Sequence, residues 1–241
     1  DYRAALAAGF VPTALPLEGT PDAPCTWTAM ADPAGDERPL NCVRWQEARA
    51  FCQHRGGDLP TAAQWEYAAT RAGRAASSLF PWGDDIPRCR VSDCSEPPCH
   101  AIDAGQPNGC IPLSDTPGPL PATDFHDPIF GDVSVPLNDD PGSLVYGLGG
   151  GVAEMTRDAL HDFESPCWRA ATLTDPICGE PDAILRERRG GHWASRGAAT
   201  LAASRAATFT GANLASSLFQ PGPFLADDAS GFRCVYVEVT P

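Results

Sequence analysis

The chain has 241 residues, of which 43% are hydrophobic, so it can bury a substantial core and is expected to form a single domain over residues 1–241. Its formal net charge of −14 repels phosphate backbones and anionic membrane surfaces, which argues against nucleic acid as a partner. All 17 lysine-or-arginine positions are arginine, which excludes enzymes that need a catalytic lysine.

The first elements are helical. The opening "DYRAALAAGF" is typical of the end of an amphipathic helix, so we expect further residues upstream of Asp1, a targeting signal among them. Ala48, Phe51 and Cys52 have helical spacing, and Gly56 with Gly57 is expected to end that helix.

A second helix is expected to begin after Thr61, because Thr61 and Gln64 have the spacing of a capping box. Its end is expected at Gly73. The residues predicted to form its apolar face are Ala63, Trp65, Tyr67 and Ala68.

Residues 79–146 contain no predicted element of more than a few residues. The glycine-rich "SLVYGLGGGVAEMTRDAL" then predicts tight turns that flank a short strand. "ASGFRCVYVEV" predicts a terminal strand. We expect one face of it to carry Phe232, Cys234, Tyr236 and Glu238, and the other to carry Arg233, Val235, Val237 and Val239. No apolar run is long enough to span a bilayer.

Ten cysteines, an even number spread along the chain, predict disulfides and an oxidising compartment. Zinc is the alternative for the loop from Cys89 to Cys110, which also contains a histidine. Its four cysteines are separated by four, four and ten residues, without the close pairs of structural zinc sites, which favours disulfides.

Four stretches in this order resemble the formylglycine-generating enzyme family, also called the sulfatase-modifying factor family. They are "PLNCVRWQEARAFC…GGDLPTAAQWEYAA", "FPWGDD", "GLGGGVAEMTRD" and "RGGHW…R……GFRC". The resemblance covers roughly Asp1 to Val235, without the family's N-terminal strand region. It implies an α+β fold, an irregular, loop-rich, disulfide-stapled variant of the C-type lectin-like fold.

The resemblance also implies a lost copper site. Enzymes of this family oxidise a substrate cysteine to formylglycine with copper held by two cysteines a few residues after the Gly-Gly pair. Ser195 and Thr200 stand at those positions, and no cysteine lies between Cys178 and Cys234. Hydroxyl groups do not replace the soft thiolates that copper(I) requires, so no copper is expected. The degenerate site comprises His192, Ser195, Arg196 and Thr200.

The family resemblance implies which cysteines pair. It implies that Cys52 pairs with Cys234, Cys25 with Cys42, and Cys167 with Cys178. The remaining Cys89, Cys94, Cys99 and Cys110 then pair among themselves in one of three ways.

Calcium is the remaining family cofactor. The resemblance implies one site formed by Asp93 and Asp127 with the carbonyls of Cys94 and Ile129, since oxygen ligands suit this hard cation. The alternative is that both aspartates are solvated loop residues. A second family site is expected to be weakened or lost, because Gly151 replaces its asparagine. Its Glu154 is then a structural anchor satisfied by backbone N–H groups; an acid/base pair with Asp158 is the less favoured alternative.

The tryptophans divide into two groups. Trp45, Trp65, Trp82 and Trp193 are expected to pack inside the protein. Trp27 and Trp168 are the candidates for exposed contacts.

These features predict a non-catalytic binding or structural module that is secreted, periplasmic or held at the cell surface, with a lipid anchor upstream of Asp1 as one option. Its partner would be a protein or a glycan, or it would be a subunit of a surface assembly. One alternative is an enzyme of different chemistry that uses His192, Ser195 and Arg196. Another is a variable-ligand binder whose loops diversify after the Gly-Gly pair.

Overall fold

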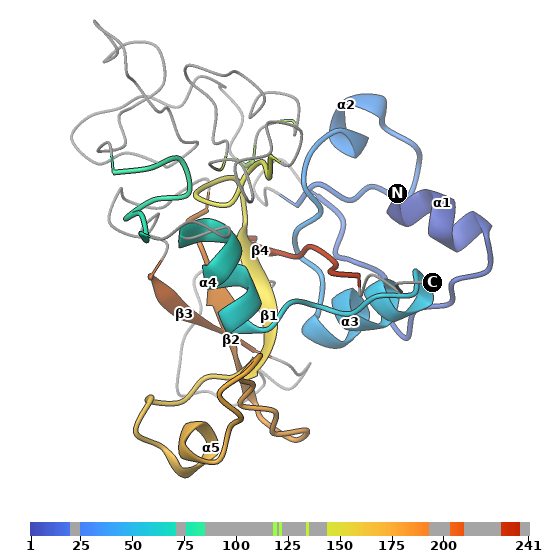
Figure 1. The fold of residues 1–241 in the computed structure, drawn as a ribbon. Helices are drawn as coiled ribbons and strands as arrows, with labels where there is room; N and C mark the ends of the chain where they lie inside the picture. The colour runs from blue at the N-terminus through green and yellow to red at the C-terminus, as the bar shows by residue number, and fades with distance from the viewer. Residues whose placement is uncertain are drawn as a thin grey trace, which may run out of the picture.

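The computed structural model describes residues 1–19, 25–70, 76–84, 118–119, 121, 134, 144–192, 203–209 and 228–236. The helices are α1 (Tyr2–Ala7), α2 (Pro33–Asp36), α3 (Trp45–His54), α4 (Ala62–Thr70) and α5 (Pro166–Arg169). The strands are β1 (Ala153–Ala159), β2 (Leu185–Arg189), β3 (Arg205–Phe209) and β4 (Ser230–Gly231). The fold is therefore mixed α/β, as Figure 1 shows.

The four strands form one sheet in the order β3-β2-β1-β4. The β1–β2 and β2–β3 pairs are antiparallel, whereas β4 runs parallel to β1. The glycine-rich segment does lead into a strand, as predicted, and that strand is β1. The terminal strand is much shorter than predicted. After Gly231 the chain leaves the sheet, and Val235 instead forms an isolated bridge with Asp58.

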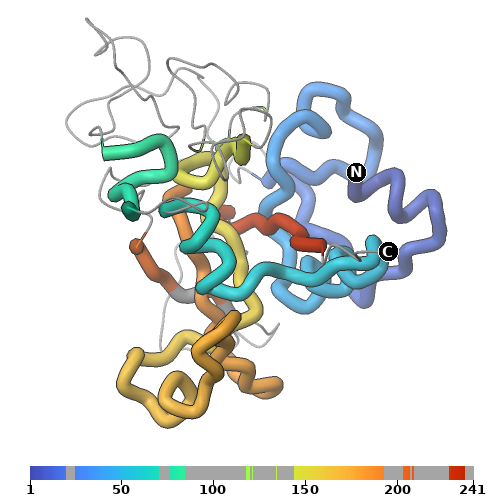
Figure 2. The backbone as a smooth tube through the Cα atoms, in the orientation of Figure 1, coloured from blue at the N-terminus to red at the C-terminus, as the bar shows by residue number. Residues whose placement is uncertain are grey.

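Helix α3 has the predicted position and end. Ala48, Phe51 and Cys52 are buried, and Gly56 adopts a positive φ of 83° that ends the helix. The Cys52–Cys234 disulfide fixes this helix to the C-terminal segment, which crosses from the sheet to α3 in Figure 2.

The prediction that Trp27 is an exposed contact is wrong. Only 6% of this side chain is exposed, because it packs into the aromatic cluster beside α3. Its ring lies edge-on to Tyr2 at 5.6 Å, and the Arg3 guanidinium covers it at 4.3 Å. Trp45, Trp65 and Trp82 are buried as predicted, and Trp193 lies outside the described residues.

Helix α4 begins with the predicted capping box. The Thr61 N–H donates to Gln64 Oε1 at 2.9 Å, and the Gln64 N–H donates to Thr61 Oγ1 at 3.0 Å. The predicted apolar face is partly wrong, because 53% of Tyr67 is exposed. The buried face consists of Ala62, Trp65 and Ala69, which follow helical spacing from the first residue of the helix. The expected end at Gly73 lies outside the described residues.

Asp58 connects three parts of the fold. Its carboxylate accepts hydrogen bonds from Arg49 of α3 at 2.9 Å and from Arg157 of β1 at 3.2 Å. Burial acts to raise the pKa of this carboxyl, but these hydrogen bonds and one from the Leu59 N–H outweigh it, so the pKa is lowered. The ionised form therefore contributes to the stability of the junction.

Three of the implied cysteine pairs are disulfides in this structure: Cys25–Cys42, Cys52–Cys234 and Cys167–Cys178. Cys89, Cys94, Cys99 and Cys110 lie outside the described residues. None of the described helices has the length and apolar character that a bilayer crossing requires.

Candidate functional site

The glycine-rich segment 147–151 and the Gly190–Gly191 pair meet beside α4. The Gly191 N–H donates to the carbonyl of Gly149 at 3.0 Å. Gly190 has a φ of +78°, and a Cβ on it would lie 2.5 Å from the Leu148 carbonyl oxygen and 3.1 Å from the Trp65 ring. Only glycine fits there. The backbone that leads into the degenerate site is thus fixed by close packing.

His192 is the one residue of the degenerate site that the structure describes. It is half-buried and directly follows this glycine contact. Ser195, Arg196 and Thr200 lie outside the described residues, as do the proposed calcium ligands Asp93, Cys94, Asp127 and Ile129. These residues therefore remain predictions from the sequence.

Glu154 is an anchor, but its partners differ from those predicted. Its Oε2 accepts a hydrogen bond from Trp65 Nε1 at 2.7 Å and one from Arg233 Nε at 2.6 Å. Arg233 Nη2 donates to Oε1 of the same carboxylate and to the Tyr146 carbonyl. The donors are thus side chains and not backbone N–H groups. Both oxygens of the Glu154 carboxylate thus accept hydrogen bonds from side-chain N–H donors.

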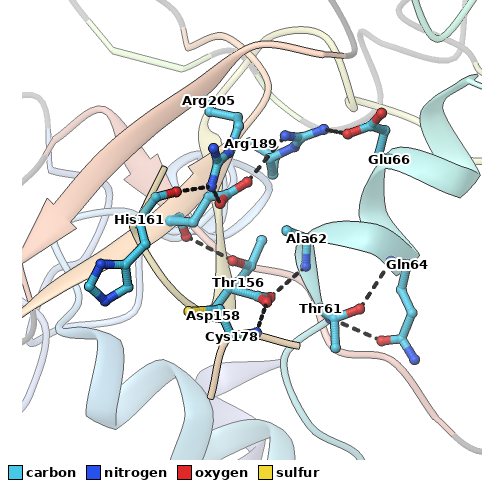
Figure 3. A network of polar contacts seen from close by, with 11 residues as sticks. Thr61, Ala62, Gln64, Glu66, Thr156, Asp158, His161, Cys178, Arg189 and Arg205 are labelled. Carbon is cyan, nitrogen blue, oxygen red and sulfur yellow. Dashed lines mark hydrogen bonds and ion pairs between the residues drawn. The ribbon is translucent and has the colours of Figure 1, made fainter. Parts of the chain in front are cut away.

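A chain of charged side chains runs from Glu66 on α4 through Arg189 to Arg205 on β3 (Figure 3). The Glu187 side chain is fully buried, and it binds Arg189 at 3.1 Å and also Arg205. Arg189 continues the chain to Glu66 on α4. The hydrogen bond from Arg205 to Glu187 raises the pKa of that guanidinium. The run "RERR" in β2 was the only sequence signal of this network.

Asp158 occupies a separate polar site at the far end of β1. Its carboxylate accepts the Ala62 N–H at 2.7 Å and the Cys178 N–H at 2.8 Å (Figure 3). Burial raises the pKa of this carboxyl although both hydrogen bonds act to lower it. Glu154 and Asp158 therefore have separate structural partners, and their contacts give no support to an acid/base pair.

The connection between β1 and β2, residues 160–184, forms a lobe around α5 that projects from the sheet in Figure 1. Trp168, a predicted exposed contact, is half-buried here and lies 5.6 Å from the Phe163 ring. Phe163 is 62% exposed, so it is the more accessible aromatic side chain of this lobe.

A cavity of about 450 Å³ lies away from the Gly-Gly pair, between the N-terminal helices and the C-terminal segment. Aromatic and cationic side chains share its wall. They include Trp27, Phe232, Tyr236, Arg38 and Arg55. Asp1, Asp36 and Glu37 also line it, so the wall carries charged groups of both signs beside its aromatic side chains.

Comparisons with known proteins agree with this scaffold. The profile of a family described as "Sulfatase-modifying factor enzyme 1-like domain" matches residues 19–237. A formylglycine-generating enzyme of Thermomonospora curvata is 29% identical over 175 residues, which cover 68% of this chain and 49% of that protein.

Two proteins of Bos taurus match over shorter segments. Its formylglycine-generating enzyme is 36% identical over 90 residues, covering 36% of this chain and 22% of that protein. Its inactive C-alpha-formylglycine-generating enzyme 2 is 38% identical over 63 residues, covering 24% of this chain and 20% of that protein. The chain thus spans less than half the length of each of these three relatives.

Proposed function

Because the chain belongs to the sulfatase-modifying factor enzyme 1-like domain family, we propose that it is a non-catalytic binding or structural module that keeps this family's scaffold without its copper chemistry. The observation that carries the proposal is the pair of hydroxyl residues, Ser195 and Thr200, after Gly190 and Gly191. Hydroxyl groups have pKa values far above neutrality and bind copper(I) poorly, so the donor set does not fit this metal.

Cysteines elsewhere in the described structure do not supply the missing thiols. All six described cysteines are joined in disulfides. The other four lie before residue 111, and none lies between Cys178 and Cys234, so no nearby shift in sequence restores the pair.

Three buried carboxylates of the described residues have structural hydrogen-bond partners. Glu154, Asp158 and Glu187 are buried carboxylates, and each is engaged by fixed hydrogen-bond donors. Buried, hydrogen-bonded carboxylates of this kind hold strands and loops in place. This assignment supports a structural role for groups that could otherwise be taken as catalytic.

The proposed location is outside the cytoplasm, with the protein secreted, periplasmic or held at the cell surface. Disulfides persist in such oxidising compartments, and three are present here. The proposed partner is a protein or a glycan. The cavity lined by Trp27, Tyr236 and Arg55 offers one place for a side chain or small group of that partner.

The experiment is a conversion assay on a peptide with a single cysteine, supplied with copper(I) and oxygen and followed by peptide mass. The Thermomonospora curvata relative serves as the positive control. We expect the relative to convert the cysteine to formylglycine and this chain to leave it unchanged. Conversion by this chain at a rate within tenfold of the relative would overturn the proposal.

A further inference from the structure

The lobe between β1 and β2 brings together three side chains of the types that bind zinc. One potential ligand atom from each of His161, Cys178 and Glu180 lies within 4.8 Å of the other two. The His161 ring already contacts the Glu180 carboxylate, with Nε2 and Oε2 3.0 Å apart. Imidazole, thiolate and carboxylate are the three common zinc ligands in proteins.

The cysteine of this group is not available in the state described here, because Cys178 is bonded to Cys167. A disulfide sulfur lacks the negative charge through which a thiolate binds metal. Reduction would free the Cys178 thiol beside His161 and Glu180, and it would free a second thiol from Cys167 at the same place.

We propose that reduction of the Cys167–Cys178 disulfide by a dithiol creates a Zn²⁺ site in this lobe, with Cys178, His161 and Glu180 as ligands. This inference goes beyond the proposed function and does not depend on it. The dithiol transfers two electrons and two protons to the S–S bond and becomes a disulfide itself. Zn²⁺ then binds the Cys178 sulfur as a thiolate and releases its proton to solvent.

The backbone around Cys178 is held independently of the disulfide. Its N–H donates to Asp158 at 2.8 Å, and its carbonyl accepts from the Ala159 N–H at 2.8 Å. These bonds attach Cys178 to the end of β1, two residues before His161. Breaking the S–S bond removes neither of them, so the ligand residues should stay together.

The other two ligands have room to adjust. The His161 side chain is 37% exposed and that of Glu180 is 49% exposed. Zinc–ligand bonds of about 2.0–2.3 Å place tetrahedral ligand atoms about 3.3–3.8 Å apart, so a contraction of about 1.0–1.5 Å from the 4.8 Å limit suffices. Rotation of two half-exposed side chains can supply that movement.

The experiment uses Cys167→Ser, which frees the Cys178 thiol without any reductant and leaves the other cysteines unchanged. Co²⁺ is the probe, on protein whose affinity tag has been removed, because a cobalt–thiolate bond gives a near-ultraviolet charge-transfer band. We expect C167S to bind one Co²⁺ with this band, to lose it when Zn²⁺ is added, and to bind at least tenfold more tightly than oxidised wild-type protein.

Two matched variants identify the ligands. C167S/C178S should show no thiolate band, and C167S/H161A should bind at least tenfold more weakly than C167S. A C167S protein without the band, or one whose affinity is unchanged by H161A, would overturn the proposal. Loss of the native circular dichroism spectrum in C167S would also overturn it, since the proposed site requires the lobe to stay folded without the disulfide.

Discussion

Glu187→Gln should cost about 3–5 kcal/mol of unfolding free energy. The Glu187 side chain is fully buried, and it binds Arg189, which is 1% exposed, and Arg205, which is 17% exposed. Glutamine removes the charge and turns an N–H donor toward one of the two guanidinium groups. Arg189 keeps its ion pair with Glu66, so the uncompensated charge is that of Arg205, and breaking a buried ion pair on one side typically costs about 3–5 kcal/mol. A whole domain is stable by only about 5–15 kcal/mol, so this loss should be large.

Urea unfolding with the disulfides intact measures this change as a shift of the midpoint at constant slope. Asp36→Asn is the matched control, because Asp36 pairs with Arg3 where both side chains are partly exposed, at 38% and 24%. Pairs of that kind contribute about 0–1 kcal/mol. A Glu187→Gln cost no larger than that of Asp36→Asn would refute the assignment of a buried charge network.

Three further predictions concern single features of the fold. Gly190→Ala should lower the free energy of unfolding by about 2–4 kcal/mol, because the residue has a φ of +78° and the new Cβ would lie 2.5 Å from a carbonyl oxygen. Thermal unfolding measures this change, and a loss below about 0.5 kcal/mol would contradict the close packing at this position. Asp58 has a lowered pKa, so its contribution to the free energy of unfolding should be present above about pH 4 and be lost as the pH falls through the folded-state pKa. Between pH 7 and pH 3, the unfolding midpoint of the wild type should fall more steeply than that of Asp58→Asn. Parallel curves would argue against this role. Removal of the Cys52–Cys234 disulfide, whose cysteines are separated by 182 residues, should lower the free energy of unfolding by about 5 kcal/mol through chain entropy. Removal of the Cys167–Cys178 disulfide, with a separation of 11, should lower it by about 3 kcal/mol. Urea unfolding of the two double-serine variants tests this order, and the reverse order would contradict it.

Local physics was sufficient to predict α3 and the start of α4. The Thr61–Gln64 capping box and the glycine at position 56 act within one helical turn, so their effect can be inferred from spacing alone. The three described disulfides followed from the family pattern, since nothing in their spacing identifies a partner 182 residues away.

Burial and tertiary partners were harder to infer. Trp27 is buried because Tyr2 and Arg3, which lie far from it in sequence, cover its ring. Glu154 binds Arg233 across 79 positions of the chain, a contact that no local pattern indicates. The predicted terminal strand stops early because Cys234 must reach Cys52 on α3, which takes the chain away from the sheet.

The proposed loss of the copper site needs no tertiary information, because it depends on which residues follow the Gly-Gly pair. Ser195 and Thr200 present oxygen where copper chemistry needs sulfur. The close packing of Gly190 adds that contacts with Leu148 and Trp65 hold the backbone entering this segment in place.

Copper(I) titration of the oxidised protein against a chromophoric chelator tests the non-catalytic assignment most directly. The Thermomonospora curvata relative provides the comparison under the same conditions. We expect this chain to take no copper(I) from the chelator and the relative to take a stoichiometric amount. Removal of one equivalent of copper(I) by this chain would contradict the assignment, because it would show a soft-ligand site despite Ser195 and Thr200.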